Sequence, residues 1–114
     1  MATSTIKRMA SIENVTDKLT FTALAKSAYR VGNRIHFQAE IYFDSYIADH
    51  SYTLAVDSSI RPKSSFAPLS AIMVDSNFTP RGVVASWATA NGVFWRANSQ
   101  NGNYLLVSGS WLID

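Results

Sequence analysis

Residues 34–43 read RIHFQAEIYF, and this stretch decides the fold class. Its apolar side chains fall on every second position, which is the pattern of a β-strand with one buried face and one exposed face. The apolar set is Ile35, Phe37, Ala39, Ile41 and Phe43, and the alternate set is Arg34, His36, Gln38, Glu40 and Tyr42. We therefore predict a half-buried strand across these residues.

The segment just before this strand, residues 19–31, allows two interpretations. Apolar residues occupy every second position from Leu19 to Ala25, and Gly32-Asn33 supplies two residues that tolerate a positive φ, which favours a strand that forms a hairpin with residues 34–43. The alternative is a helix that Asp17 caps and that ends at Gly32. The threonines and the lack of a 3.6-residue period favour the strand.

After residue 43, short apolar runs are separated by turn residues at intervals of eight to twelve positions. Asn91-Gly92 between two apolar runs predicts a second hairpin, with Trp87 and Trp95 close together across it. About eight or nine short strands result. The prediction is an all-β fold, an antiparallel β-sandwich or barrel spanning residues 18–114, preceded by an N-terminal arm or first strand over residues 1–17.

Composition narrows the functional classes. The chain has 114 residues, 47% of them hydrophobic and none of them cysteine, so one domain with one core is expected and neither a disulfide framework nor a thiolate site can form. The net charge is only +2, and Lys7-Arg8 is the only adjacent basic pair, which argues against nucleic-acid binding. No apolar run is long enough to insert into a membrane, and residues 1–20 lack the apolar region of a signal peptide.

The sequence contains few residues that could form a metal site or an active site. Asp49 and His50 are neighbours and point to opposite faces if they lie on a strand, so we expect no metal site and no cofactor. Glu40 shares a strand face with His36 and Gln38, but its nearest carboxylate partner, Asp44, lies roughly 13 Å away along an ideal strand. That separation is too long for a pair of catalytic carboxylates, and we expect no enzymatic activity.

Aromatic residues are more numerous than a small core needs, and some lie beside polar residues. Flat aromatic faces next to hydrogen-bonding side chains are typical of saccharide sites. The candidate binding residues are Trp95, Arg96, Trp87, Tyr42 and His36, and residues 42–50 are a candidate binding loop. The alternative is that the paired tryptophans belong to the core or to a subunit interface.

The order of the turns and strands predicted in residues 56–114 resembles that of a known protein family. Ile60-Arg61-Pro62 precedes Phe66-Ala67-Pro68 and a strand, then come residues 82–85, the Asn91-Gly92 hairpin and a last strand that ends in GSWLID at residues 109–114. This order resembles the C-terminal β-domain of tail-fibre and baseplate proteins of siphophages that infect Gram-positive bacteria. The closing residues are similar to those of receptor-binding heads of lactococcal phages.

The resemblance implies a homotrimer at the phage tail tip, which binds host cell-wall saccharides and contacts other baseplate or tail proteins. It implies a virion protein that assembles in the bacterial cytoplasm and has no enzymatic activity. Two alternatives remain open: a structural baseplate adaptor that binds other virion proteins, and a non-viral lectin-like domain.

Overall fold

The chain forms an all-β domain, as the sequence predicts. A computed structural model describes residues 11–63, 66–98 and 102–113. In these ranges the only helical elements are two 3₁₀ turns, Thr16–Lys18 and Ser58–Ile60, and no helix could span a membrane. The nine strands are β1 (Ile12–Asn14), β2 (Ala25–Val31), β3 (Arg34–Tyr42), β4 (His50–Leu54), β5 (Ala67–Val74), β6 (Pro80–Val83), β7 (Ser86–Thr89), β8 (Gly92–Ala97) and β9 (Tyr104–Leu112).

All strand pairs are antiparallel and belong to one sheet, in the order β1-β2-β3-β9-β5-β7-β8-β4, with β6 on β5. Strand β5 changes neighbours along its length: residues 67–69 pair with β7, and residues 70–74 pair with β9. Pro68 lies in the first part, where β5 no longer pairs with β9. Proline has no N–H to donate, and it is tolerated where a strand lacks a partner on one side. The sheet folds over at this change of partners.

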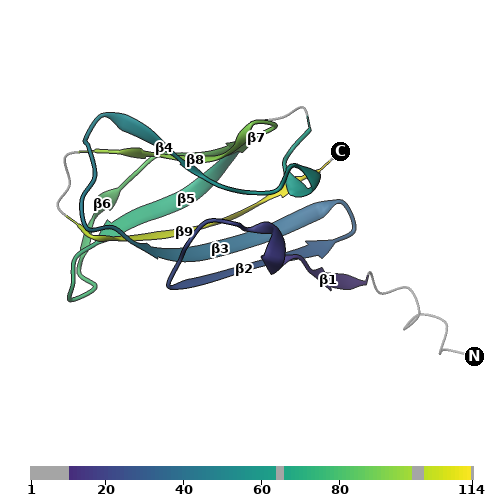
Figure 1. The fold of residues 1–114 in the computed structure, drawn as a ribbon, viewed down its shortest axis with the longest axis horizontal. Helices are drawn as coiled ribbons and strands as arrows, with labels where there is room; N and C mark the ends of the chain where they lie inside the picture. Colours follow the sequence, from purple (N-terminus) through teal and green to yellow (C-terminus); the bar gives the residue numbers. More distant parts are fainter. Residues whose placement is uncertain (1–10, 64–65, 99–101, 114) are drawn as a thin grey trace, which may run out of the picture.

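Gly109 marks the same place on β9. A Cβ at this glycine would overlap Cδ2 of Leu69, so the missing side chain makes room for Leu69 where β5 leaves β9. The fold places a second layer (β4, β7 and β8) over a first layer (β2, β3, β9 and the end of β5), as Figure 1 shows. The sheet does not close, so the barrel alternative is wrong.

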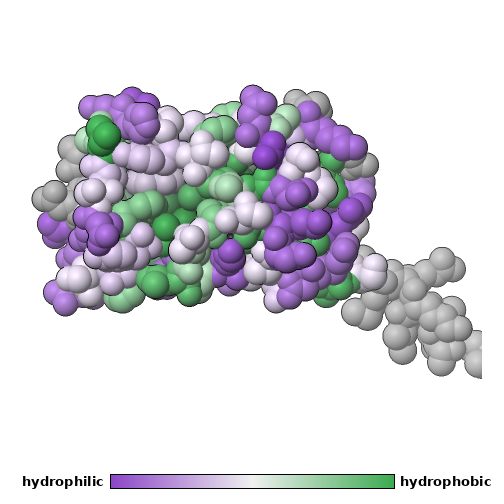
Figure 2. Space-filling view, viewed as in Figure 1, coloured by the Kyte–Doolittle hydropathy of each residue, from purple (hydrophilic) through white to green (hydrophobic). Residues whose placement is uncertain are grey.

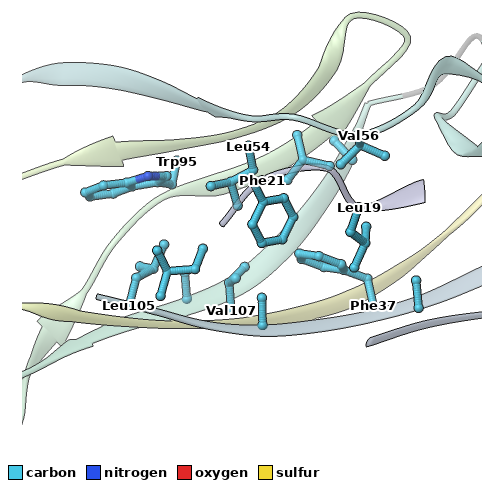
Figure 3. Packing of buried hydrophobic residues seen from close by; sticks show 14 of the residues in the cluster. Leu19, Phe21, Phe37, Leu54, Val56, Trp95, Leu105 and Val107 are labelled. Carbon is cyan, nitrogen blue, oxygen red and sulfur yellow. The ribbon is translucent and has the colours of Figure 1, made fainter. Parts of the chain in front are cut away.

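The core lies between the two layers. Trp95 on β8 lies above Leu105 and Val107 on β9, with Phe21 and Phe37 further along the same space (Figure 3). Figure 2 shows hydrophobic residues along the middle of the molecule and hydrophilic residues mainly toward its periphery. Burial of the apolar residues of both layers is the main force that holds the layers together.

The strand predicted at residues 34–43 is confirmed as β3. Its side chains alternate between buried and exposed along the strand, and Tyr42 is 47% exposed. The neighbouring hairpin turns at Gly32-Asn33, since Val31 pairs with Arg34 and Gly32 has a φ of 61°. The helical alternative for residues 19–31 is wrong, but the strand begins only at Ala25. Leu19 forms an isolated bridge with Val56.

The second predicted hairpin exists with a different register. Thr89 pairs with Gly92, so the two loop residues are Ala90 and Asn91, and Gly92 is the first residue of β8. This shift of one residue places Trp87 opposite Phe94, with Trp95 opposite Ser86. Because adjacent positions on a strand face opposite sides, the prediction that Trp87 and Trp95 lie together is wrong.

Residues 1–17 were predicted to form an arm or a first strand. β1 pairs with β2 at Ile12, Glu13 and Asn14, which is a short strand at the edge of the sheet. Residues 1–10 lie outside the described residues.

Candidate functional site

Four polar residues form a row across the outer face of the first layer. Gln38 on β3 lies opposite Ser27 on β2 and Ser108 on β9, and Ser108 lies opposite Ser70 on β5. Cross-strand partners point to the same face of a sheet. Ser27 is half-buried and the other three are exposed. The row therefore presents three hydroxyl groups and one amide on a single surface.

A second row runs beside the first, two residues further along β3. Glu40 lies opposite Ala25 on β2 and Leu106 on β9, and Leu106 lies opposite Ile72 on β5. Glu40, Leu106 and Ile72 are half-buried. This row combines one carboxylate with apolar neighbours.

The two rows line a hollow of about 570 Å³. A neighbouring hollow of about 350 Å³ shares Ser27, Gln38 and Ser108 with it and extends to Tyr29 and His36. Serine and alanine side chains are short, so the sheet surface stays open between longer side chains. We call the two hollows together the outer groove. Each volume falls within the range of about 300–1,000 Å³ that is typical of small-molecule sites.

Aromatic side chains stand at both ends of the outer groove. Tyr29 and His36 are cross-strand partners at one end. At the other end, Tyr104 lies between Tyr42 and Phe78, with ring centroids 5.2 Å and 5.0 Å away. Tyr42 and Phe78 are 47% and 52% exposed, so their rings are accessible to a ligand.

The phenol of Tyr42 is fixed by its neighbour Asp44. A hydrogen bond to the Asp44 carboxylate raises the pKa of Tyr42, with the negative charge of Asp44 adding to the effect. The phenol therefore stays protonated, and its hydroxyl is oriented by a group outside the groove.

Phe78 is held in an unusual backbone conformation. Its φ is 59°, in the left-handed region that a bulky residue rarely adopts, at a cost of about 1–3 kcal/mol. The turn that imposes this conformation is closed by Asp75, whose Oδ1 accepts hydrogen bonds from the N–H of Asn77 (2.9 Å) and the N–H of Thr79 (3.0 Å). The turn thus places an exposed aromatic ring beside Tyr104 at the end of the groove.

Ionised Asp75 is expected to stabilise this turn in a pH-dependent way. The hydrogen bond from the Thr79 N–H, helped by Asn77 and the charge of Arg81, holds the pKa of Asp75 below its usual value. A group with a lowered folded-state pKa stabilises the fold above its unfolded pKa of about 3.9 and loses this contribution as the pH falls through the folded pKa. We expect Asp75→Asn to lower the Tm near pH 7 and to have a much smaller effect near about pH 2. Thermal unfolding followed by circular dichroism measures both values; an equal decrease at the two pH values would contradict the prediction.

The polar groups of the outer groove are available to a ligand. Among the described residues, the side chains of Ser27, Gln38, Glu40, Ser70 and Ser108 take part in no hydrogen bond or ion pair. A ligand with hydroxyl groups could therefore bind them without displacing an intramolecular bond.

A separate hollow of about 380 Å³ borders the predicted binding loop at residues 42–50. Three of its polar side chains already have partners: Asn98 donates to the carbonyl of Val83, Asn103 donates to the carbonyl of Phe43, and Asp44 accepts from Tyr42. The outer groove is therefore the stronger candidate site.

The structure does not bring the five candidate binding residues together. His36 and Tyr42 lie on the outer face of β3, toward opposite ends of the outer groove. Trp95 is 0% exposed and packs in the core, where it contacts Phe43 and Tyr52. It is therefore not a lining residue of the groove.

Trp87 and Arg96 lie on the outer face of the second layer. Trp87 stacks between Phe94 and Phe66, with centroid distances of 5.8 Å and 6.2 Å. Arg96 is exposed, and its guanidinium donates to the carbonyl of Asp49 (2.6 Å) and to Oγ of Ser51 (3.2 Å). Their strands, β7 and β8, belong to the layer opposite the one that carries the outer groove (Figure 1).

Sequence reasoning identified the polar side of β3 but missed the residues from other strands that complete the groove. Ser27, Ser70 and Ser108 are unremarkable in the sequence, and only the pairing registers place them beside Gln38. Phe78 could have drawn attention, because it follows Asp75-Ser76-Asn77, a stretch rich in turn-forming residues.

Carboxylates and histidines are scattered in the part of the chain that the structure describes, and no group of three or more of them could hold a metal ion there. Asp44 lies beyond the end of β3 and is hydrogen-bonded to Tyr42, whereas Glu40 lies in the groove. The arrangement can bind polar and aromatic-stacking ligands through preformed groups.

Neither the protein-family models nor the curated proteins gave a match to this chain.

Proposed function

We propose that this chain is a non-enzymatic saccharide-recognition domain of a phage tail tip, and that it binds a saccharide of the host cell surface in the outer groove. One observation carries the proposal: a row of unpartnered hydroxyl and amide groups lies in an open hollow with accessible aromatic rings at both ends. Hydroxyl groups of a sugar pair with such polar groups, and its CH-rich faces stack on aromatic rings.

The tail-tip setting is supported by the resemblance of residues 56–114 to the C-terminal β-domain of siphophage tail-fibre and baseplate proteins. In that setting the domain is a homotrimer within the virion, attached to other baseplate or tail proteins. A single open groove gains little net free energy from one sugar, so several linked copies would supply the avidity for adhesion.

Filling the hollow tests the proposal. Ser108→Phe places a large side chain in the middle of the groove, at an exposed strand position where phenylalanine is compatible with a β-sheet. We expect at least a tenfold loss of saccharide affinity, about 1.4 kcal/mol. A glycan array identifies the best saccharide for the native chain, and calorimetric titration measures the affinity of each variant.

The matched control is Thr53→Phe. Thr53 is also exposed on a strand, but it lies on the second layer, opposite Phe94. This control is expected to keep the native affinity. Equal affinities of the native chain and the Ser108→Phe variant would exclude the outer groove as the saccharide site.

The structural adaptor function has one observation in its favour. Phe66, Trp87 and Phe94 form a stack on the outer face of the second layer, and Phe66 is 64% exposed, which is typical of a surface that packs against another protein. In that case Ser108→Phe changes no function, and the mass of the assembly in solution, measured by light scattering, depends on Trp87.

A further inference from the structure

Glu40 is the only carboxylate among the residues that line the outer groove. It is half-buried on the floor of the groove, between Ala25 and Leu106, with Ile72 next to Leu106 in the same row. Its side chain takes part in no hydrogen bond or ion pair among the described residues. The apolar neighbours reduce its contact with water and strengthen any charge-assisted bond that a ligand brings.

The positively charged side chains near β3 interact with groups other than Glu40. Lys26 lines the same hollow, but its Nζ donates to the carbonyl of Leu19 (2.7 Å) and to that of Phe21 (2.8 Å), and it lies 5.5 Å from the centre of the Phe21 ring. Its cross-strand partner Ala39 is buried, which places the Lys26 side chain on the inner side of the sheet. The ammonium of Lys26 therefore does not neutralise Glu40 in the groove.

The nearby arginines also interact with groups other than Glu40. Arg34 donates to Oγ of Ser110, and Arg30 donates to the carbonyl of Gly32, both beyond the Tyr29–His36 end of the groove. Arg81 lies near Asp75, where its charge helps to lower the pKa of Asp75. The floor of the groove is thus left with one negative charge among neutral hydroxyl, amide and apolar groups.

We propose that the outer groove selects a saccharide that carries a free amino group, and that Glu40 binds the protonated amine. This inference rests on the proposed saccharide function and names the class of sugar. The Glu40 and Gln38 rows are about 7 Å apart along β3, so one short oligosaccharide reaches both. An N-acetylated sugar offers no positive charge to Glu40, and a sulfated or carboxylated sugar is repelled.

The test compares free-amine sugars with their N-acetylated counterparts. The probes are glucosamine, galactosamine and mannosamine and the three N-acetyl derivatives, titrated into the ¹⁵N-labelled full chain near neutral pH. Backbone amide shifts locate the binding, and their concentration dependence gives the affinity. We expect shifts at Ser27, Gln38 and Ser108, with at least one free-amine sugar bound about tenfold more tightly than its N-acetyl form.

Two variants assign the preference to Glu40. Glu40→Gln keeps the shape of the side chain and removes its charge, so the free-amine preference is expected to disappear. Glu13→Gln is the matched control, because Glu13 is the only other glutamate in the sequence and lies on β1. The native preference should persist in this control and weaken as salt is added.

The outcomes separate this inference from the proposed function. Equal or tighter binding of the N-acetyl forms in the groove overturns the amine preference and leaves saccharide recognition in place. A preference that survives Glu40→Gln overturns the role of Glu40. If none of the six sugars shifts an amide of the groove, the amine inference is overturned, and the Ser108→Phe comparison still decides whether the groove is the saccharide site.

Discussion

Replacing Trp95 with alanine is expected to reduce the free energy of unfolding by about 3–5 kcal/mol. Trp95 is completely buried, and its ring contacts three aromatic neighbours, Phe43, Tyr46 and Tyr52, with centroid distances of 4.9 Å, 6.1 Å and 5.1 Å. The substitution removes these contacts and leaves a cavity that the surrounding strands cannot fill without moving. A domain of this size has a total stability of about 5–15 kcal/mol, so a large part of it would be lost.

Urea unfolding of the native chain and the Trp95→Ala variant measures this loss. Trp87→Ala is the matched control, because it removes the same side chain from the half-buried outer face of β7 and should cost clearly less. A loss below about 1 kcal/mol for Trp95→Ala would contradict the core position of Trp95. Loss of saccharide binding in this variant would reflect unfolding, so Trp95→Ala is not a test of the binding site.

The second large effect is expected from Trp111→Phe, which should cost about 1–3 kcal/mol more than Trp95→Phe. Both tryptophans are buried, but their indole N–H groups differ. Nε1 of Trp111 donates to the carbonyl of Ile60 (2.6 Å), whereas Nε1 of Trp95 has no hydrogen-bond partner in the described part of the chain. Phenylalanine at position 111 leaves the Ile60 carbonyl unpaired, while at position 95 it removes an unpaired donor.

The two variants serve as controls for each other, since each loses the same atoms from a buried ring. Their free energies of unfolding are compared by urea denaturation, with equal slopes m as evidence that the same surface is exposed on unfolding. A cost of Trp95→Phe equal to that of Trp111→Phe would show that the Ile60 hydrogen bond contributes nothing, or that Trp95 Nε1 has a partner.

Much of the fold could be predicted because β3 carries a strict two-residue period. A strand with one buried face must alternate in this way, and the glycine at position 32 supplies the positive φ that the following hairpin needs. Local sequence was less informative before β2: residues 19–25 alternate like a strand, yet the strand begins only at Ala25. There, burial of Leu19 and Phe21 against distant strands decided the conformation.

Register limited what could be predicted about the tryptophans. Asn91-Gly92 correctly predicts a hairpin, but the loop comprises Ala90 and Asn91, with the Asn91 N–H bonded to Oγ1 of Thr89. In the observed register Trp87 pairs with Phe94, the residue next to Trp95, and adjacent side chains of a strand point to opposite faces. This is why Trp95 belongs to the core while Trp87 remains on the outer surface.

The sequence by itself determined the all-β class, the strand at the centre of the first layer and the polar outer side of that strand, because these depend on periodicity along a single segment. Tertiary structure alone decided that the sheet folds into two layers at β5 and that Ser27, Ser70 and Ser108 join Gln38 in one row. The physical reason is that a groove across a sheet is built from residues far apart in the chain. Their positions follow from the pairing register and the packing of the core, and neither is encoded within one strand.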